Sequence, residues 1–164
     1  LESFSTALHS NDKDYWIATT EYPSGNFNII KTTNGKFDLQ FLTFPLPEYS
    51  KTSISICKFS PNSKIVATNT FTKTNKTDTT QIDFYLNLFM FDNSTGRIYN
   101  RLVLNIGKAF SHYNGIKAFE FSPNSKFLYL PQIDGILQLD LSSWDSAIIH
   151  KSAGVAKNKD FLFY

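Results

Sequence analysis

The sequence predicts an all-β protein built from repeated four-stranded units. Aromatic residues make up 16% of the 164 residues, and sixteen of these are Phe. They stand beside many Thr, Ser and Asn residues, a balance that favours sheet and turns over helix. Two further observations support this prediction. A heptapeptide occurs twice, and a weaker third copy of the repeated unit lies upstream.

The heptapeptide repeat is the strongest signal in the chain. Residues 58–64, KFSPNSK, recur as residues 120–126, EFSPNSK, and only the first position differs between the two copies. Proline favours the second position of a tight turn, and we expect the following Asn to take the bridge or left-handed conformation. Apolar residues flank both copies, so the repeat predicts a hairpin.

A second correspondence places an insertion in the first of these two units. Residues 88–92, LFMFD, align with residues 136–140, ILQLD, and the spacing between these two segments is shorter than that between the two heptapeptides. The first unit must therefore contain extra residues, which we assign to the polar segment 72–80 as a long hairpin loop. Residues 93–97 then form a glycine-containing turn, and residues 98–104 form the fourth strand.

The weaker copy lies upstream. Residues 32–36, TTNGK, match residues 93–97, NSTGR, and residues 9–13 supply the preceding turn, here without a proline. No linker separates the units, so we expect one domain over residues 1–164. The units cover residues 9–50, 51–112 and 113–151, and residues 152–164 begin a further one.

Four-stranded units at this spacing are typical of β-propeller blades. Ile54 and Ile56 fall on one face of an inner strand while Cys57 and Phe59 fall on the other, as expected for a sheet packed between two others. We therefore expect a partial propeller of about three to four antiparallel blades, with an open β-sandwich as the alternative. Because a ring needs at least four blades and residues 161–164 are apolar, we interpret the chain as a fragment.

Charge and composition exclude several classes of protein. Sixteen basic and fourteen acidic residues give a net charge of +2, far from the positive field expected of a nucleic-acid-binding protein. No apolar run is long enough to insert into a membrane as a helix. The glycine-rich phosphate loops and the G-x-S-x-G motif do not occur, so we expect no cofactor and no enzyme of those classes.

The repeated turns, with Asp92 and Asp140 ending the strands before a turn, resemble those of WD-repeat-like propellers. Residues 9–16, 27–30 and 121–141 further resemble the N-terminal propeller of large Bacteroidetes surface proteins. Many proteins of that group carry a gliding-motility-associated sorting domain for type nine secretion.

This resemblance extends from about His9 to Ser152. It departs at Lys31, which stands where the first unit would have its strand-ending Asp, and the 164 residues do not contain the sorting domain. The resemblance implies an exported, non-enzymatic scaffold located outside the cell or on its surface.

The residues that could carry chemistry are dispersed. His9, His112 and His150 show no metal-ligand spacing, and we expect them at turns and strand edges rather than at a metal site. Cys57 is predicted to be a buried, inert thiol. The two carboxylates of residues 12–14 are too few for a calcium loop and indicate a solvated turn.

The remaining candidate residues lie in or beside predicted turns and loops. Asp92 and Asp140 are expected to accept backbone N–H bonds in turns rather than to act as an acid–base pair. Trp144, which follows a Ser-Ser turn, is the best candidate for a recognition surface. Possible attachment sites for glycans are the sequons at residues 75–77 and 93–95 and the short O-glycosylation-like motifs at residues 78–80 and 145–147.

These observations favour a non-catalytic scaffold or binding module that contacts a protein or a surface glycan. The alternative is a propeller-based hydrolase or lyase whose catalytic residues lie partly in blades outside this sequence. A third hypothesis is a spacer that presents other domains.

Overall fold

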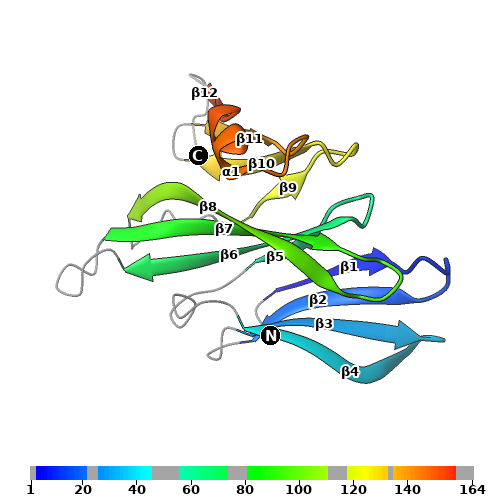
Figure 1. The fold of residues 1–164 in the computed structure, drawn as a ribbon. Coiled ribbons are helices and arrows are strands. Elements are labelled where there is room, and N and C mark those ends of the chain that lie inside the picture. The colour runs from blue at the N-terminus through cyan, green and yellow to red at the C-terminus, as the bar shows by residue number, and fades with distance from the viewer. Residues whose placement is uncertain are drawn as a thin grey trace, which may run out of the picture.

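The computed structural model shows an all-β chain of three four-stranded antiparallel sheets, stacked as successive layers (Figure 1). In each sheet the strands follow one another in chain order, as in consecutive β-propeller blades. The prediction of a partial propeller is therefore confirmed. The structure describes residues 3–21, 26–45, 56–73, 81–110, 118–132 and 135–157.

The first and second sheets are each a meander of four strands. The first sheet contains β1 (Phe4–Leu8), β2 (Tyr15–Glu21), β3 (Asn26–Thr33) and β4 (Lys36–Pro45). The second sheet contains β5 (Cys57–Phe59), β6 (Ile65–Lys73), β7 (Gln81–Phe91) and β8 (Ile98–Phe110).

The third sheet includes a short helix before its last strand. It contains β9 (Glu120–Phe121), β10 (Phe127–Gln132), β11 (Gly135–Asp140), α1 (Ser146–Lys151) and β12 (Gly154–Lys157). Asp145 caps α1 by accepting the backbone N–H groups of Ala147 and Ile148 at 2.8 and 3.1 Å. This helix was not predicted from the sequence. None of the helices in the described residues is long and apolar enough to cross a membrane.

The middle sheet is apolar on both faces, which is why it can be packed between the other two. Its first-sheet face joins a cluster of buried residues: Ala7, Trp16, Ala18, Phe27, Ile29, Cys57, Phe59, Val66, Phe89, Phe91 and Ile98. Its opposite face joins a second cluster: Ile65, Ala67, Phe84, Leu86, Leu88, Leu104, Phe119, Phe121, Leu128, Leu130, Leu139, Leu141 and Ile149. As predicted, Cys57 and Phe59 face one way and Ile56 the other, whereas Ile54 lies outside the described residues.

The repeated heptapeptides form equivalent turns, as predicted. In the first, the Ser60 hydroxyl donates to Asn62 Oδ1 at 2.8 Å, and Asn62 Oδ1 also accepts the Lys64 N–H at 3.1 Å. The residue with positive φ is the second serine, Ser63 at 54°, and not the asparagine as we expected. The Asn side chain stabilises the turn by accepting hydrogen bonds, so it does not itself need the left-handed conformation.

The second copy repeats these contacts. Ser122 Oγ donates to Asn124 Oδ1 at 2.7 Å, Lys126 N donates to the same oxygen at 3.1 Å, and Ser125 has a φ of 60°. In the first sheet the corresponding positive-φ residue is Asp12, at 57°. The upstream turn without proline therefore has the same backbone pattern.

The sheet boundaries differ from the predicted units. Strand β1 precedes residue 9 and pairs with β2, so it belongs to the first sheet. Strand β12 pairs with β11 and completes the third sheet, whereas the sequence analysis places residues 152–164 in a further unit. Both strands are short edge strands, and such strands give little periodic signal.

The alignment of the third strands is also corrected. Val66 pairs with Phe89 and Leu128 pairs with Leu139, so Phe89 corresponds to Leu139 and not to Leu137, as the sequence alignment has it. Strand β6 extends to Lys73 and β7 begins at Gln81, so part of the predicted loop 72–80 is strand. Residues 74–80 lie outside the described residues.

Candidate binding pocket

The first strands of the first two sheets, β1 and β5, are joined through serine side chains in and just before β1. Ser3 Oγ accepts the backbone N–H of Cys57 at 3.1 Å, and Ser5 Oγ accepts that of Phe59 at 3.0 Å. These contacts satisfy two backbone donors of the short strand β5. They therefore position β5 against the first sheet without a backbone ladder between the two sheets.

The first strands of the second and third sheets, β5 and β9, are joined by an ion pair. Lys58 Nζ on β5 contacts Glu120 Oε2 on β9, and the two side chains are 37% and 61% exposed. Exposure at this level makes the pair a weak contributor to stability. Its ammonium and carboxylate groups remain accessible to a ligand.

A pocket of about 370 Å³ lies along β1, β5 and β9, and all three sheets contribute to it. Its volume lies in the range that small-molecule sites occupy. Phe4 is 74% exposed and Ile136 is 41% exposed, so the pocket includes accessible apolar surface. The lining residues are Ser3, Phe4, Ser5, Ile56, Cys57, Lys58, Ala118, Phe119, Glu120, Tyr129, Pro131 and Ile136.

Cys57 lines the pocket but is a buried thiol, as predicted. Its side chain is 2% exposed, and Sγ donates to the Ala18 carbonyl at 3.2 Å. Burial raises the pKa of Cys57 to about 11, so the thiol is neutral at physiological pH. A neutral, buried thiol is a poor nucleophile.

The three histidines are separated in the fold. His9 is 7% exposed at the start of the β1–β2 turn and stacks on Trp16, with ring centroids 5.3 Å apart. His150 is exposed in the last turn of α1, not at a strand edge, and His112 lies outside the described residues. Over the described part of the chain, no group of three or more His, Cys, Asp or Glu residues is placed to hold a metal ion.

Asp14 has a structural contact that the sequence did not show. Its carboxylate accepts hydrogen bonds from the Asn11 side chain at 2.8 Å and from the Asn34 N–H at 3.1 Å, and these bonds lower its pKa. The carboxylate therefore connects the β1–β2 turn with the β3–β4 turn. It is only 6% exposed, whereas we expected both carboxylates of residues 12–14 to be solvated.

Asp92 and Asp140 accept turn N–H groups, as expected. The Ser94 hydroxyl and N–H donate to Asp92 at 2.7 and 2.9 Å and the Thr95 hydroxyl at 2.8 Å, which lowers the pKa of Asp92 to about 2. Asp140 accepts the Ser142 N–H at 2.8 Å, and hydrogen bonding to Ser142 lowers its pKa. Asp140 ends β11 whereas Asp92 follows β7, so the two are not at equivalent positions.

Trp144 lies away from the pocket. Its indole N–H donates to the Asn100 carbonyl at 2.8 Å, and its partly buried ring packs against the cluster between the second and third sheets. The structure thus gives Trp144 a packing contact between sheets. Its role in recognition stays a prediction.

Two of the proposed glycan attachment motifs fall in the described residues. The Asn93 side-chain nitrogen donates to the Leu8 carbonyl at 2.8 Å, so the nitrogen that would carry an N-linked glycan is engaged between two sheets. Ser146 of the other motif is half-buried at the start of α1. Residues 75–80, which contain the remaining motifs, lie outside the described residues.

The pocket residues were missed by the sequence analysis, although one signal was available. Lys58 and Glu120 occupy the single position at which the two heptapeptides differ, and they contact each other. Two copies of a repeat can form an ion pair at equivalent positions only if they carry opposite charges there. Their sequences must therefore differ at that position. The opposite charges of Lys58 and Glu120 at this one position could have indicated the contact.

Comparisons with known proteins give no functional assignment. No family model matches the sequence, and no curated protein is significantly similar to it. Among solved structures, the chain is similar to a protein from Bacteroides uniformis described as a "putative 6-phosphogluconolactonase", at 10% identity and a TM-score of 0.36. The match covers 94% of this chain and 53% of the other, so the chain spans about half the length of that protein.

Proposed function

We propose that this chain is a non-catalytic binding module whose pocket along β1, β5 and β9 holds part of a protein or surface glycan. The supporting observation is that three different sheets contribute accessible aromatic, apolar and charged groups to one pocket. Ligand sites in proteins commonly combine an apolar lining with a few polar groups in this way.

The contacts of the reactive groups favour binding over catalysis in this part of the molecule. Cys57 is a neutral, buried thiol, and Asp92 and Asp140 are engaged in turns. Lys58 and Glu120 neutralise each other at the pocket and can present a donor and an acceptor to a ligand. A peptide side chain, or the end of a glycan that stacks on Phe4 or Tyr129, fits a site of this volume.

The resemblance noted in the sequence adds a cellular setting to this proposal. We place the module in an exported bacterial surface protein, where it acts as a scaffold for surface contacts. Fractionation of the native producer, with antibodies to this chain, tests that placement. Signal confined to the interior of the cell would contradict it.

Binding is tested with the immobilised chain on a glycan array and a peptide array. We expect a hit whose affinity falls at least tenfold in Phe4→Ala and in Tyr129→Ala, because each removes aromatic surface from the pocket. Tyr99→Ala is the matched control, since Tyr99 is a 44% exposed aromatic residue on β8 that does not line the pocket. Equal affinity in all three variants, or turnover of a bound glycoside or peptide by the wild-type chain, would overturn the proposal.

A further inference from the structure

The ion pair in the pocket can form more hydrogen bonds than the one between its own members. An ammonium group has three N–H donors and a carboxylate has two acceptor oxygens. The contact between Lys58 Nζ and Glu120 Oε2 uses one donor and one oxygen. The pocket therefore presents donors and acceptors side by side, and its two charged groups sum to zero.

Two hydroxyl groups of the pocket add further hydrogen-bonding capacity. Ser5 Oγ accepts the Phe59 N–H, and within the described residues its own proton is donated to no acceptor. The Tyr129 hydroxyl makes no hydrogen bond in the described part of the chain. A hydroxyl group both donates and accepts, so these two groups match polar, uncharged ligands.

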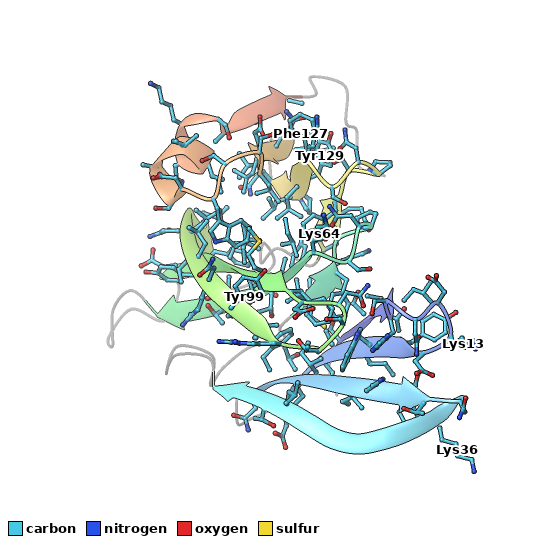
Figure 2. All side chains as sticks on the ribbon, turned by 45° about the vertical axis from the view of Figure 1, so that its right-hand side comes forward. Lys13, Lys36, Lys64, Tyr99, Phe127 and Tyr129 are labelled. Carbon is cyan, nitrogen blue, oxygen red and sulfur yellow. The ribbon has the colours of Figure 1, made fainter. Side chains whose placement is uncertain are left out.

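The pocket also contains aromatic surface. Phe4 and Tyr129 line it from the first and third sheets, and Phe4 is 74% exposed. Tyr129 lies beside Phe127 on β10, whereas Tyr99 of β8 lies away from both (Figure 2). Aromatic rings pack well on apolar faces. A ligand that fills this site therefore needs an apolar face as well as polar groups.

The ion pair selects against charged ligands. A carboxylate or an ammonium group on the ligand would pair with one member and displace the other. The displaced group would then lack a counter-ion in a site that the ligand shields from water, and this costs free energy. A neutral ligand leaves Lys58 and Glu120 in contact, so the pair discriminates by charge.

Among neutral ligands, the geometry favours a sugar over a peptide. The N–H and C=O of one peptide unit point in opposite directions, so one unit does not bond both members of a pair in contact. Two neighbouring hydroxyls of a sugar ring lie together, and each donates and accepts. The C–H groups of the same ring supply the apolar face, which the side-chain amide of Asn or Gln lacks.

We propose that the pocket binds a neutral pyranose sugar, such as the terminal residue of a glycan. Two neighbouring hydroxyls of the sugar bond to Lys58 and Glu120, and the face of its ring packs on Phe4 or Tyr129. This inference rests on the binding function proposed above and names the class of its ligand.

The first test titrates the wild-type chain of residues 1–164 with the methyl pyranosides of glucose, galactose and mannose. Each sugar is compared with analogues that carry a carboxylate or an amino group at C6. We expect at least one neutral sugar to bind at least threefold tighter than both of its charged analogues. The open-chain hexitol, which lacks the ring face, should bind at least tenfold more weakly. Tighter binding of a charged analogue, or no binding of any of the three sugars, would overturn the inference.

Variants test whether the ion pair sets this preference. In Glu120→Gln the pocket keeps only the lysine charge, so affinity for the carboxylate analogue relative to the neutral sugar should rise about fivefold. In Lys58→Gln the amino analogue should gain by the same factor. A charge at C6 lies within about 8 Å, the screening distance at physiological salt, of both positions in a site of this size. Glu21→Gln and Lys64→Gln remove the same charges outside the pocket lining and are expected to change neither ratio.

The outcomes separate this inference from the proposed function. If both pocket variants keep the wild-type circular dichroism spectrum and the wild-type preference, the ion pair does not recognise the ligand and the inference is wrong. If only peptides bind, and Phe4→Ala and Tyr129→Ala weaken that binding, the sugar is wrong and the binding function stands. If neither glycans nor peptides bind, both proposals fail.

Discussion

The indole ring of Trp16 on β2 lies directly against the backbone of Gly96 in the turn between β7 and β8. A β-carbon placed at Gly96 would stand 2.5 Å from the ring of Trp16. The same indole donates its N–H to the Asn93 carbonyl at 2.8 Å and meets Phe91 edge-on, with ring centroids 5.9 Å apart. One tryptophan of the first sheet is thus enclosed by a turn of the second.

Gly96→Ala is expected to destabilise the fold more than Gly35→Ala. Both glycines have positive φ, 75° and 73°, so both substitutions carry the backbone cost of about 1–2 kcal/mol. Only the Gly96 β-carbon meets another group, and this overlap adds about 1–3 kcal/mol. Urea unfolding of both variants measures the difference, and equal midpoints would show that Trp16 does not lie against Gly96.

Trp16→Phe is expected to lose about 1–3 kcal/mol of unfolding free energy. The substitution removes the indole N–H, leaves the partly buried Asn93 carbonyl without that donor, and reduces the packed aromatic volume. Trp144→Phe, which loses the equivalent bond to Asn100 at a less buried position, is expected to cost less. Chemical denaturation compares the two, and the opposite order of stability would contradict the burial that we describe.

Asn62→Ala and Asn124→Ala are expected to destabilise the fold by similar amounts, about 1 kcal/mol each. Each asparagine accepts a serine hydroxyl and the N–H of the following lysine in equivalent turns. Asn26→Ala, at an exposed pair with Glu21, serves as the comparison. A marked loss of stability in only one of the two turns, measured by thermal unfolding, would show that the turns are not equivalent.

Asp92→Asn is expected to flatten the acid limb of the stability profile. Hydrogen bonds from Ser94 and Thr95 lower the pKa of Asp92 from 3.8 to about 2, so the folded state favours the carboxylate. Its contribution is complete above pH 3.8 and is lost as the pH falls toward about 2. Thermal midpoints between pH 5 and 2 check this, with Asp12→Asn as the control because the described residues donate no hydrogen bond to Asp12. An unchanged acid limb in Asp92→Asn would contradict the shift.

Cys57 is expected to resist thiol reagents in the folded protein. Raising the thiol pKa from 9.0 to about 11 lowers the thiolate fraction roughly 100-fold at neutral pH, and burial slows the reaction further. Labelling followed by mass spectrometry should be complete only after denaturant is added. Rapid labelling without denaturant would place Cys57 on an accessible surface of the pocket.

Local turn chemistry accounts for what the sequence predicted of the fold. The heptapeptide places two hydrogen-bonding side chains and a proline in one tight turn, which fixes the hairpin and the strands beside it. The alignment of β7 with β11 was misplaced by two positions, because a shift of two residues keeps every side chain on the same face of the strand and the apolar pattern therefore does not detect it. Helix α1 has only six residues, too few for a helical period to be visible.

The binding pocket was not predictable in the same way. Its lining comes from three sheets, and its charged groups, Lys58 and Glu120, belong to different units of the repeat and lie far apart in the sequence. Trp144, which the sequence favoured as a recognition residue, packs between sheets instead of lining this pocket. The position of an aromatic residue after a turn predicts that it lies at the edge of its own sheet. It does not show whether a neighbouring sheet packs against it.

The central claim is that the first and second sheets stack face to face, because that packing buries the cluster between them and brings residues of both sheets to the pocket. Nuclear Overhauser effects between the α-protons of Gly96 and the indole ring protons of Trp16 test it most directly, since these two residues belong to different sheets. The structure predicts strong cross-peaks and upfield-shifted Gly96 α-protons. Their absence in the folded protein would contradict the stacking.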